Sequence, residues 1–144
     1  MPEVTPTSGQ IERSLSQRIQ AVYKDELGVR PEKVVCQFFD QKLAIALEKV
    51  ATPSEQLLLS NERVESAKAL RSHLDIALKP RLIELIEEVS GVAVKTLLSD
   101  TDLTYDVAGM IVVLEDVPPV RNLESIPKVK KEKIAEVNQE ESTS

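Results

Sequence analysis

The first part of the chain contains hydrophobic residues at helical spacing, three to five positions apart, with polar residues between them. These apolar positions are Ile11, Leu15, Ile19, Val22 and Leu27. The pattern predicts an amphipathic helix that packs one face against a core. Thr7 and Gln10 have the spacing of a capping box at its start, and Gly28 suits its end. We therefore predict a helix between Thr7 and Gly28.

The next two apolar segments have the composition and alternation of β-strands. "KVVCQFF" at 33–39 is rich in β-branched and aromatic residues. In "KLAIALEKV" at 42–50, Leu43, Ile45 and Leu47 share one face of a strand. Only two residues, Asp40 and Gln41, separate the segments, so we predict a β-hairpin.

A second helical region begins at "TPSE", where Thr52 is a capping residue, Pro53 occupies the first helical position and Glu55 lies three residues beyond the cap. Its apolar stripe consists of Val64, Ala67, Leu70, Leu74, Ala77, Leu78, Leu82, Leu85, Ile86 and Val89. Pro80 lies inside this stripe and removes a backbone hydrogen bond, so we expect a kink or a break there. Gly91 marks the end of the helix.

Two further strands follow. "VAVKTLL" at 92–98 alternates Val92, Val94 and Thr96 with three residues on the other face, as a half-buried strand does. "VAGMIVVLEDV" at 107–117 is apolar on both faces, which predicts a central strand covered on both sides. Residues 118–144 lose this periodicity and mix Lys and Arg with Glu, so we predict a disordered tail there and another at residues 1–7. One domain, residues 8–117, lies between them.

The order helix, hairpin, helix, hairpin (αββαββ) predicts an α+β fold: a two-layer sandwich with a four-stranded, mainly antiparallel sheet. The two most apolar strands, 43–49 and 107–114, are expected in the middle. One sheet face would stay open, and it would carry Ala44, Ala46, Ile111 and Val113. The C-terminal tail or a broken helix could cover this face, or a second copy of the chain could pack on it. We expect the homodimer, because the two alanines permit close approach.

Composition narrows the classes of function. At 144 residues with 42% hydrophobic content, the chain forms one core, and its −6 charge and four aromatic residues argue against nucleic-acid binding. Cys36, the single cysteine, lies in an apolar run and is expected in the core. There is no basic, apolar leader and no run of about 18 apolar residues. We expect a cytoplasmic protein that reaches a membrane only through a partner.

An acidic segment, "SDTDLTYD" at 99–106, is the strongest candidate for a ligand site. Asp100, Asp102 and Asp106 do not fit a calcium loop, because its sixth and twelfth positions fall on Tyr105 and Ile111. Asp and Thr also cap turns, so we interpret the segment as a polar turn. A ligand or partner loop at these three aspartates is the alternative. No phosphate loop, nucleophile elbow or metal-ligand spacing occurs, and His73 has no carboxylate on its own helix face, so no enzyme activity, cofactor or metal is expected.

Three motifs resemble those of a bacterial family, MpsC, which was first catalogued as a domain of unknown function. They are "LGVRPEKVV", "VATPSEQLL" and "SGVAVKTLLSDTD", and the resemblance covers roughly residues 9–116. The family pattern has basic residues after the glycines of the first and third motifs, whereas this chain has Val29 and Val92. Arg30 could substitute for the first by one position, so it joins the aspartates as a candidate ligand or partner contact.

The family takes its name from a sodium-translocating, membrane-potential-generating system. The resemblance implies association with two partners: a membrane-bound proton-channel subunit similar to those of respiratory complex I, and a zinc-dependent protein that resembles carbonic anhydrase. The function it implies is a non-catalytic regulatory module accessory to cation translocation or inorganic-carbon uptake. The alternative is a small-ligand or divalent-ion sensor that uses the loop at 99–106.

Overall fold

The computed structural model describes residues 5–143 and confirms the α+β fold, with helix and hairpin alternating twice before a C-terminal extension. The elements are α1 (Ser8–Leu27), β1 (Lys33–Phe39), β2 (Lys42–Glu48), α2 (Pro53–Ser60), α3 (Val64–Ser90), β3 (Val94–Asp102), β4 (Val107–Leu114), the 3-10 helix η1 (Leu123–Ser125) and α4 (Lys131–Thr143). The antiparallel strands form one sheet in the order β1-β2-β4-β3. The two most apolar strands are therefore central, as predicted.

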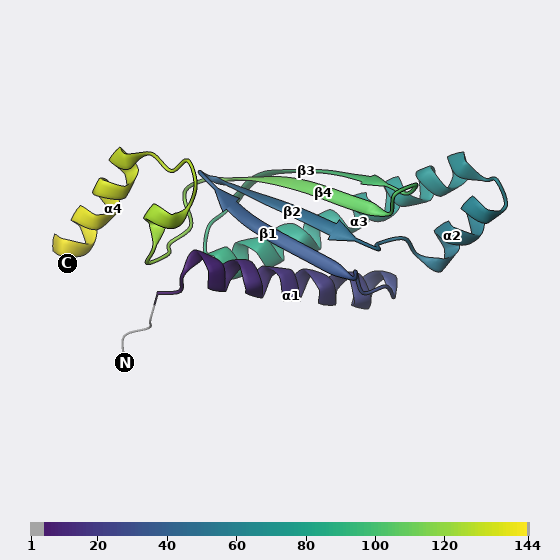
Figure 1. Ribbon diagram of the computed structural model, residues 1–144, viewed down its shortest axis with the longest axis horizontal. Coiled ribbons are helices and arrows are strands. Elements are labelled where there is room, and N and C mark those ends of the chain that lie inside the picture. Colours follow the sequence, from purple (N-terminus) through teal and green to yellow (C-terminus); the bar gives the residue numbers. More distant parts are fainter. Residues whose placement is uncertain (1–4, 144) are drawn as a thin grey trace.

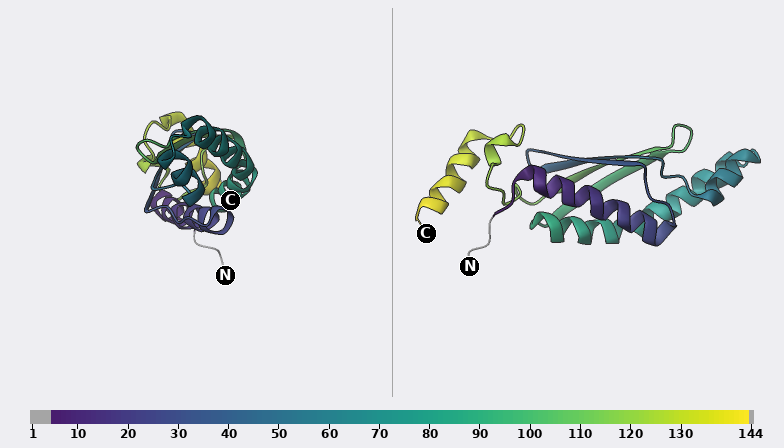
Figure 2. Two further views of the ribbon diagram at one scale, coloured as in Figure 1. Left: turned by 90° about the vertical axis from the view of Figure 1, so that its right-hand side faces the viewer. Right: turned by 60° about the horizontal axis from the view of Figure 1, so that its bottom comes forward.

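Helices α1 and α3 form the second layer, on one face of the sheet (Figure 1). The right-hand view of Figure 2 shows the same two layers, with α2 and the start of α3 extending past one end of the sheet. The core lies between the layers and includes the fully buried Leu15, Ile19, Phe38, Leu43, Leu47, Ile86 and Val112. Burial raises the pKa of Cys36 to about 11, so this core residue is a neutral thiol at physiological pH.

Local capping occurs where the sequence predicts it. Thr7 and Gln10 satisfy each other's backbone N–H groups at the start of α1, and Gly28 ends that helix with φ of 74°. Thr52 and Glu55 form the same box at the start of α2. The left-handed conformation explains the glycine at position 28, because a Cβ is disfavoured there.

Pro80 does not break α3, which runs continuously from Val64 to Ser90. The side chain at this position is exposed, so water can satisfy the carbonyl group that loses its hydrogen bond. The interruption falls instead at residues 61–63, between α2 and α3, where Glu62 has φ of 58°. The prediction of a break at Pro80 is therefore wrong, while a kink at Pro80 stays a prediction.

Strand β3 departs from the predicted alternation because it contains a bulge. Val94 pairs with Leu114 and Thr96 pairs with Val113, so Lys95 is an extra residue. The bulge places Val94 and Leu97 toward the core on the same face, although their sequence positions predict opposite faces. The strand also continues to Asp102, so only residues 103–106 form the connection to β4.

The C-terminal segment is ordered, which differs from the predicted tail at 118–144. Val117, Val120, Leu123 and Ile126 are buried in the same core, and α4 follows them. Because these four residues lie three positions apart, they share one apolar face of the segment, and this face packs against the end of the domain. Asn122 also accepts a hydrogen bond from the backbone N–H of Ser8 at 2.8 Å. The domain therefore extends past 117, while residues 1–4 of the predicted N-terminal tail lie outside the described residues.

Candidate functional site

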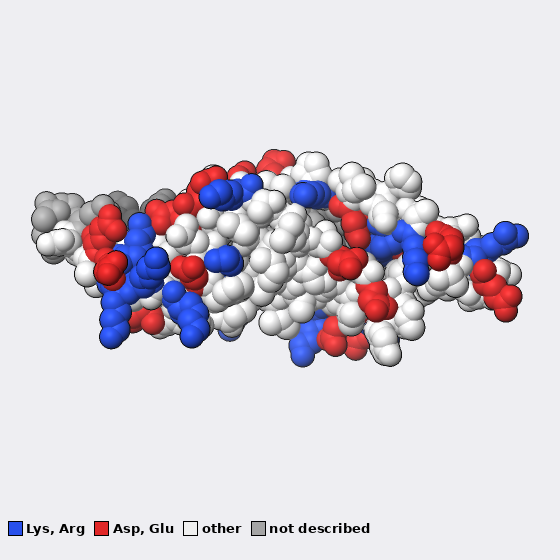
Figure 3. All heavy atoms as spheres, turned by 90° about the horizontal axis from the view of Figure 1, so that it is seen from above, with Lys and Arg blue, Asp and Glu red and all other residues white. Residues whose placement is uncertain are grey.

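The sheet face turned away from α1 and α3 carries no helix of the described chain (Figures 1 and 3). Strand register places its outward side chains in four rows across β1, β2, β4 and β3. The rows are Lys33–Glu48–Val107–Asp102, Val35–Ala46–Gly109–Asp100, Gln37–Ala44–Ile111–Leu98 and Phe39–Lys42–Val113–Thr96. We call these sixteen residues the open face. Strand β4 is thus central but uncovered on this side, contrary to the prediction.

The centre of the open face is an apolar hollow of about 460 Å³. Small residues at Ala44, Ala46 and Gly109 lie under it, and the larger Val35 and Leu98 stand at its sides. Leu98 is 61% exposed and Val35 is 46% exposed. Figure 3 shows this face as an uncharged area between charged ends of the molecule. Exposed leucine and valine side chains beside a shallow trough are typical of a protein-binding surface.

All four predicted interface residues belong to the open face, because Ala44 and Ala46 on β2 lie beside Ile111 and Val113 on β4. Sequence reasoning did not place Val35 and Leu98 there. Alternation along β1 could have identified Val35, whereas the bulge at Lys95 obscured which face Leu98 occupies. The C-terminal segment packs at the end of the sheet and not across this face, so it does not provide the cover that was considered (Figure 1).

The acidic segment binds backbone groups of its own chain. Asp106 accepts hydrogen bonds from the N–H groups of Val50 and Ala51, both at 2.8 Å. Asp102 accepts from the N–H groups of Thr104 and Tyr105 at 2.9 and 3.1 Å. These are the contacts of capping residues in a polar turn.

Replacing Asp106 with alanine is expected to lower the free energy of unfolding by about 2–3 kcal/mol. Two buried N–H groups would lose a charged acceptor, and alanine would have to adopt the φ of 54° that Asp106 has. Urea denaturation measures the change. Asp100→Ala is the control, because the one hydrogen bond of the Asp100 side chain among the described residues is an exposed one, accepted from the N–H group of its neighbour Thr101. Equal effects of the two substitutions would contradict the capping role.

The remaining candidate ligand residue, Arg30, does not join the aspartates. It precedes β1 at one edge of the sheet, whereas Asp100 and Asp102 lie on β3 at the other edge. Its guanidinium donates to the side-chain oxygen of Gln20 at 3.5 Å. Within the described residues, no three His, Cys, Asp or Glu side chains are placed to share a metal ion. His73 is exposed on α3.

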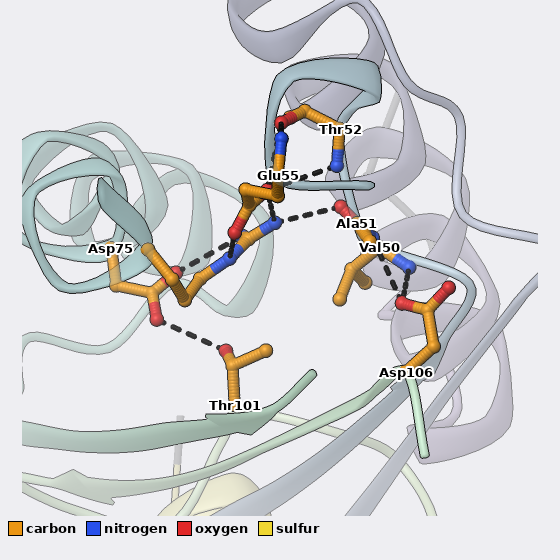
Figure 4. Close-up of polar contacts among 8 residues, drawn as sticks. Val50, Ala51, Thr52, Glu55, Asp75, Thr101 and Asp106 are labelled. Atoms are coloured by element: carbon orange, nitrogen blue, oxygen red, sulfur yellow. Dashed lines mark hydrogen bonds and ion pairs between the residues drawn. The ribbon is translucent and has the colours of Figure 1, made fainter. Parts of the chain in front are cut away.

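A buried ionic network joins α2, α3 and β3, and the sequence did not predict it (Figure 4). Arg71, which is 3% exposed, donates to both carboxylate oxygens of Glu55, at 2.7 and 2.5 Å, and to the carbonyl oxygen of Val50 at 2.8 Å. It also contacts Asp75 at 3.3 Å, and the Thr101 hydroxyl donates to Asp75 at 3.0 Å. These bonds tie three elements together at the end of the sheet.

Electrostatics in this network favour a charged arginine. Burial by itself lowers the pKa of Arg71, but its hydrogen bonds to Glu55 and the negative charges of Glu55 and Asp75 raise that pKa above its ordinary value. Burial raises the pKa of Asp75, and the charge of Arg71 and the hydroxyl of Thr101 oppose that rise. No buried side-chain nitrogen or oxygen among the described residues lacks a partner. A fully satisfied network of this kind supports structure rather than chemistry.

One pattern could have revealed the arginine. Arg71 follows the buried Ala67 by four positions and precedes the buried Leu78 by seven, so it lies on the core stripe of α3. A charged residue on such a stripe is expected to have a partner.

Comparison with known proteins identifies the family. The protein-family model described as "Na+-translocating membrane potential-generating system (MpsC)" matches residues 7–116. No curated protein and no solved structure matches the chain significantly. No helix among the described residues has the length and apolar character that crossing a membrane requires.

Proposed function

Because the chain belongs to the MpsC family, whose model matches residues 7–116, we propose that it is a non-catalytic interaction module of a membrane-associated system. In this proposal the chain forms a homodimer through the open face. It serves as an accessory, regulatory component of cation translocation or inorganic-carbon uptake, on the cytoplasmic side of the membrane. The open face is the observation that carries the proposal.

The dimer is supported by the physical cost of leaving the open face in water. Seven-residue strands at normal spacing give a four-stranded face of roughly 20 by 23 Å, and each apolar Å² removed from water contributes about 25 cal/mol. A patch of this size lies at the small end of specific interfaces, so we expect a dissociation constant in the micromolar range. Small residues over the central strands let a second sheet approach closely.

The link to the membrane system is expected to be a protein contact. Candidates are the membrane-bound proton-channel subunit and the zinc-dependent, carbonic-anhydrase-like protein that the family resemblance implies. The chain's charge of −6 opposes direct binding to anionic lipid headgroups, which supports recruitment by a protein. Gentle detergent extraction of the native membrane followed by affinity purification of the chain tests this link. Recovery of the chain without any integral membrane protein would count against it.

Substituting Leu98 with aspartate is expected to weaken the dimer at least about a hundredfold. The side chain is 61% exposed in the single chain, so the fold tolerates a charge there, whereas the dimer would lose the apolar contact of two leucines and gain two negative charges at its interface. Sedimentation equilibrium measures the dissociation constant. Ile76→Asp is the matched control, because Ile76 is 70% exposed on α3, in the helical layer. Equal dissociation constants for the two variants would contradict dimerisation through the open face.

The contacts of the loop argue against the alternative function, a ligand or divalent-ion sensor at residues 99–106. Asp102 and Asp106 already accept backbone hydrogen bonds, and Arg30 lies at the other edge of the sheet. A thermal melt with calcium, magnesium and inorganic anions separates the two functions, because a ligand that binds the folded state raises the midpoint.

A further inference from the structure

We infer that the two sheets of the proposed homodimer stack with their strand directions reversed, around a two-fold axis that lies in the interface and crosses the strands. This inference rests on the proposed function, since it specifies how a second copy of the chain sits on the open face. It is carried by the strand register and by the charges at the two ends of that face.

The two halves of the open face, which lie at opposite ends of its strands, carry different charges. The half nearest α2 carries one lysine, Lys33, and three carboxylates, those of Glu48, Asp100 and Asp102. The other half carries only Lys42 as a charged residue. The residues of the open face give net charges of −2 and +1 for these two halves, and the Asp40 carboxylate, 3.4 Å from Lys42 in the turn beside the face, offsets the positive charge. Reversing one sheet on the other avoids placing the two acidic halves against each other, which favours that orientation.

A face-to-face dimer has two simple orientations, because its two-fold axis must lie in the interface plane. An axis along the strands keeps each row facing itself and exchanges β1 with β3. An axis across the strands reverses the order of the rows and keeps each strand facing its own copy. The strand register within each sheet then determines which residues of the two chains face each other in each orientation.

With the axis across the strands, the centres of the two faces are complementary in shape. Gly109 faces Ile111 of the partner, so the larger Ile111 side chain of each sheet enters the hollow over Gly109 of the other. Ala44 faces Ala46 of the partner, and these small side chains let the two sheets approach closely.

The same axis also pairs the charges at the two ends of the face. Glu48 of each chain faces Lys42 of the partner, which gives two ion pairs in each dimer. Lys33 faces Phe39 of the partner, a favourable contact for an ammonium group. Asp100 is the one carboxylate that faces an apolar side chain, and it lies on the edge strand β3, where water reaches it.

With the axis along the strands, the match is worse. Glu48 would face Val107 of the partner, and Lys42 would face Val113. Each of these two contacts removes water from a charge without offering a partner. Asp100 faces an apolar side chain in both arrangements and does not distinguish them. Only Lys33 opposite Asp102 of the partner would be a favourable ion pair. The axis across the strands is therefore the better arrangement.

Mixing two charge-reversal variants tests the orientation. Glu48 and Lys42 are six residues apart on one strand, about 20 Å, so they cannot contact each other within one chain. In its own dimer, Lys42→Glu should place the new carboxylate opposite Glu48, and Glu48→Lys should place the new ammonium group opposite Lys42. Each variant alone should raise the dissociation constant about tenfold at low salt. An equimolar mixture should form a heterodimer with both ion pairs restored, within about threefold of the wild-type constant.

The control mixture is Lys33→Glu with Asp102→Lys, which would restore the ion pair of the axis along the strands. Both mixtures combine chains whose net charges are −8 and −4, since each reversal changes −6 by two. The long-range electrostatic repulsion between the chains is therefore the same in both mixtures. Thermal melts establish that all four variants are folded, including Lys42→Glu, which loses its 3.4 Å contact with Asp40, and Asp102→Lys, which loses the acceptor for the N–H groups of Thr104 and Tyr105.

The outcomes separate the two levels of inference. The axis across the strands is supported if the heterodimer of the first mixture binds more tightly, relative to its two variant homodimers, than the heterodimer of the control mixture does relative to its own. A larger gain in the control, or equal gains in both mixtures while the wild type still dimerises, overturns this orientation and leaves the homodimer intact. A wild-type chain that remains monomeric overturns both.

Discussion

Deleting residues 118–144 is expected to unfold the protein. The deletion removes three side chains from the core, Val120, Leu123 and Ile126, which are 5%, 4% and 4% exposed. Each buried aliphatic side chain contributes about 1.5–3 kcal/mol, so the loss of three is about 4.5–9 kcal/mol, comparable with the whole stability of a small domain. The remaining chain would also expose the apolar surface that these residues cover. Circular dichroism and a urea titration of residues 1–117 measure the effect.

A shorter deletion serves as the control. Removing residues 131–144 takes away α4 and leaves the buried Val120, Leu123 and Ile126 in place. We expect this chain to unfold cooperatively with a smaller loss of stability, because Ile134 and Val137 of α4 are only half-buried. A 1–117 chain as stable as the full protein would contradict the extension of the domain beyond Val117.

Replacing Glu55 with alanine is expected to destabilise the fold by about 3–5 kcal/mol. Arg71 would keep a buried positive charge without its main partner, and the loss of one member of a buried ion pair is strongly unfavourable. The capping box of α2 would also lose the Glu55 oxygen that accepts from the N–H and hydroxyl groups of Thr52. Chemical denaturation measures the change in the free energy of unfolding.

Glu65→Ala is the matched control for this substitution. Glu65 pairs with Lys68 at 3.8 Å on the surface of α3, and both side chains are largely exposed. Its removal should change stability by less than about 0.5 kcal/mol. The double variant Glu55→Leu with Arg71→Met should recover part of the loss, because it removes the unpaired charge of Arg71. Recovery stays incomplete, since Asp75 and the Val50 carbonyl lose the arginine that donates to them. A Glu55→Ala loss as small as that of Glu65→Ala would contradict the importance of the network.

Local sequence features predicted the architecture well where one element determines its own shape. Capping boxes at Thr7 and Thr52, the turn at 40–41 and the alternation of Leu43, Ile45 and Leu47 depend only on neighbouring residues. Two amphipathic helices and four strands then leave few ways to bury their apolar faces. The central positions of β2 and β4 followed from their apolar character.

Features that depend on distant partners were not predicted. The bulge at Lys95 depends on the pairing with β4, so the alternation of β3 alone placed Val94 and Leu97 on opposite faces, whereas both lie toward the core. Arg71 is buried because Glu55 and the Val50 carbonyl reach it from another segment. The C-terminal apolar residues recur every three positions, a spacing that matches neither the alternation of a strand nor the period of a long α-helix.

The candidate site was predicted in part for the same reason. The open face follows from alternation on two central strands, which placed Ala44, Ala46, Ile111 and Val113 on one surface. Its edges, at Val35 and Leu98, required the pairing of β1 and β3. The aspartates at 100, 102 and 106 are close in sequence, but the structure uses two of them as acceptors for backbone N–H groups of neighbouring turns.

The mass of the wild-type chain in solution tests the proposed interaction module most directly. Size-exclusion chromatography with multi-angle light scattering, run across concentrations from below to well above the micromolar range, gives this mass. We expect it to rise with concentration to twice the 16.0 kDa of one chain. A mass that stays at 16.0 kDa at the highest concentration would contradict a dimer formed through the open face.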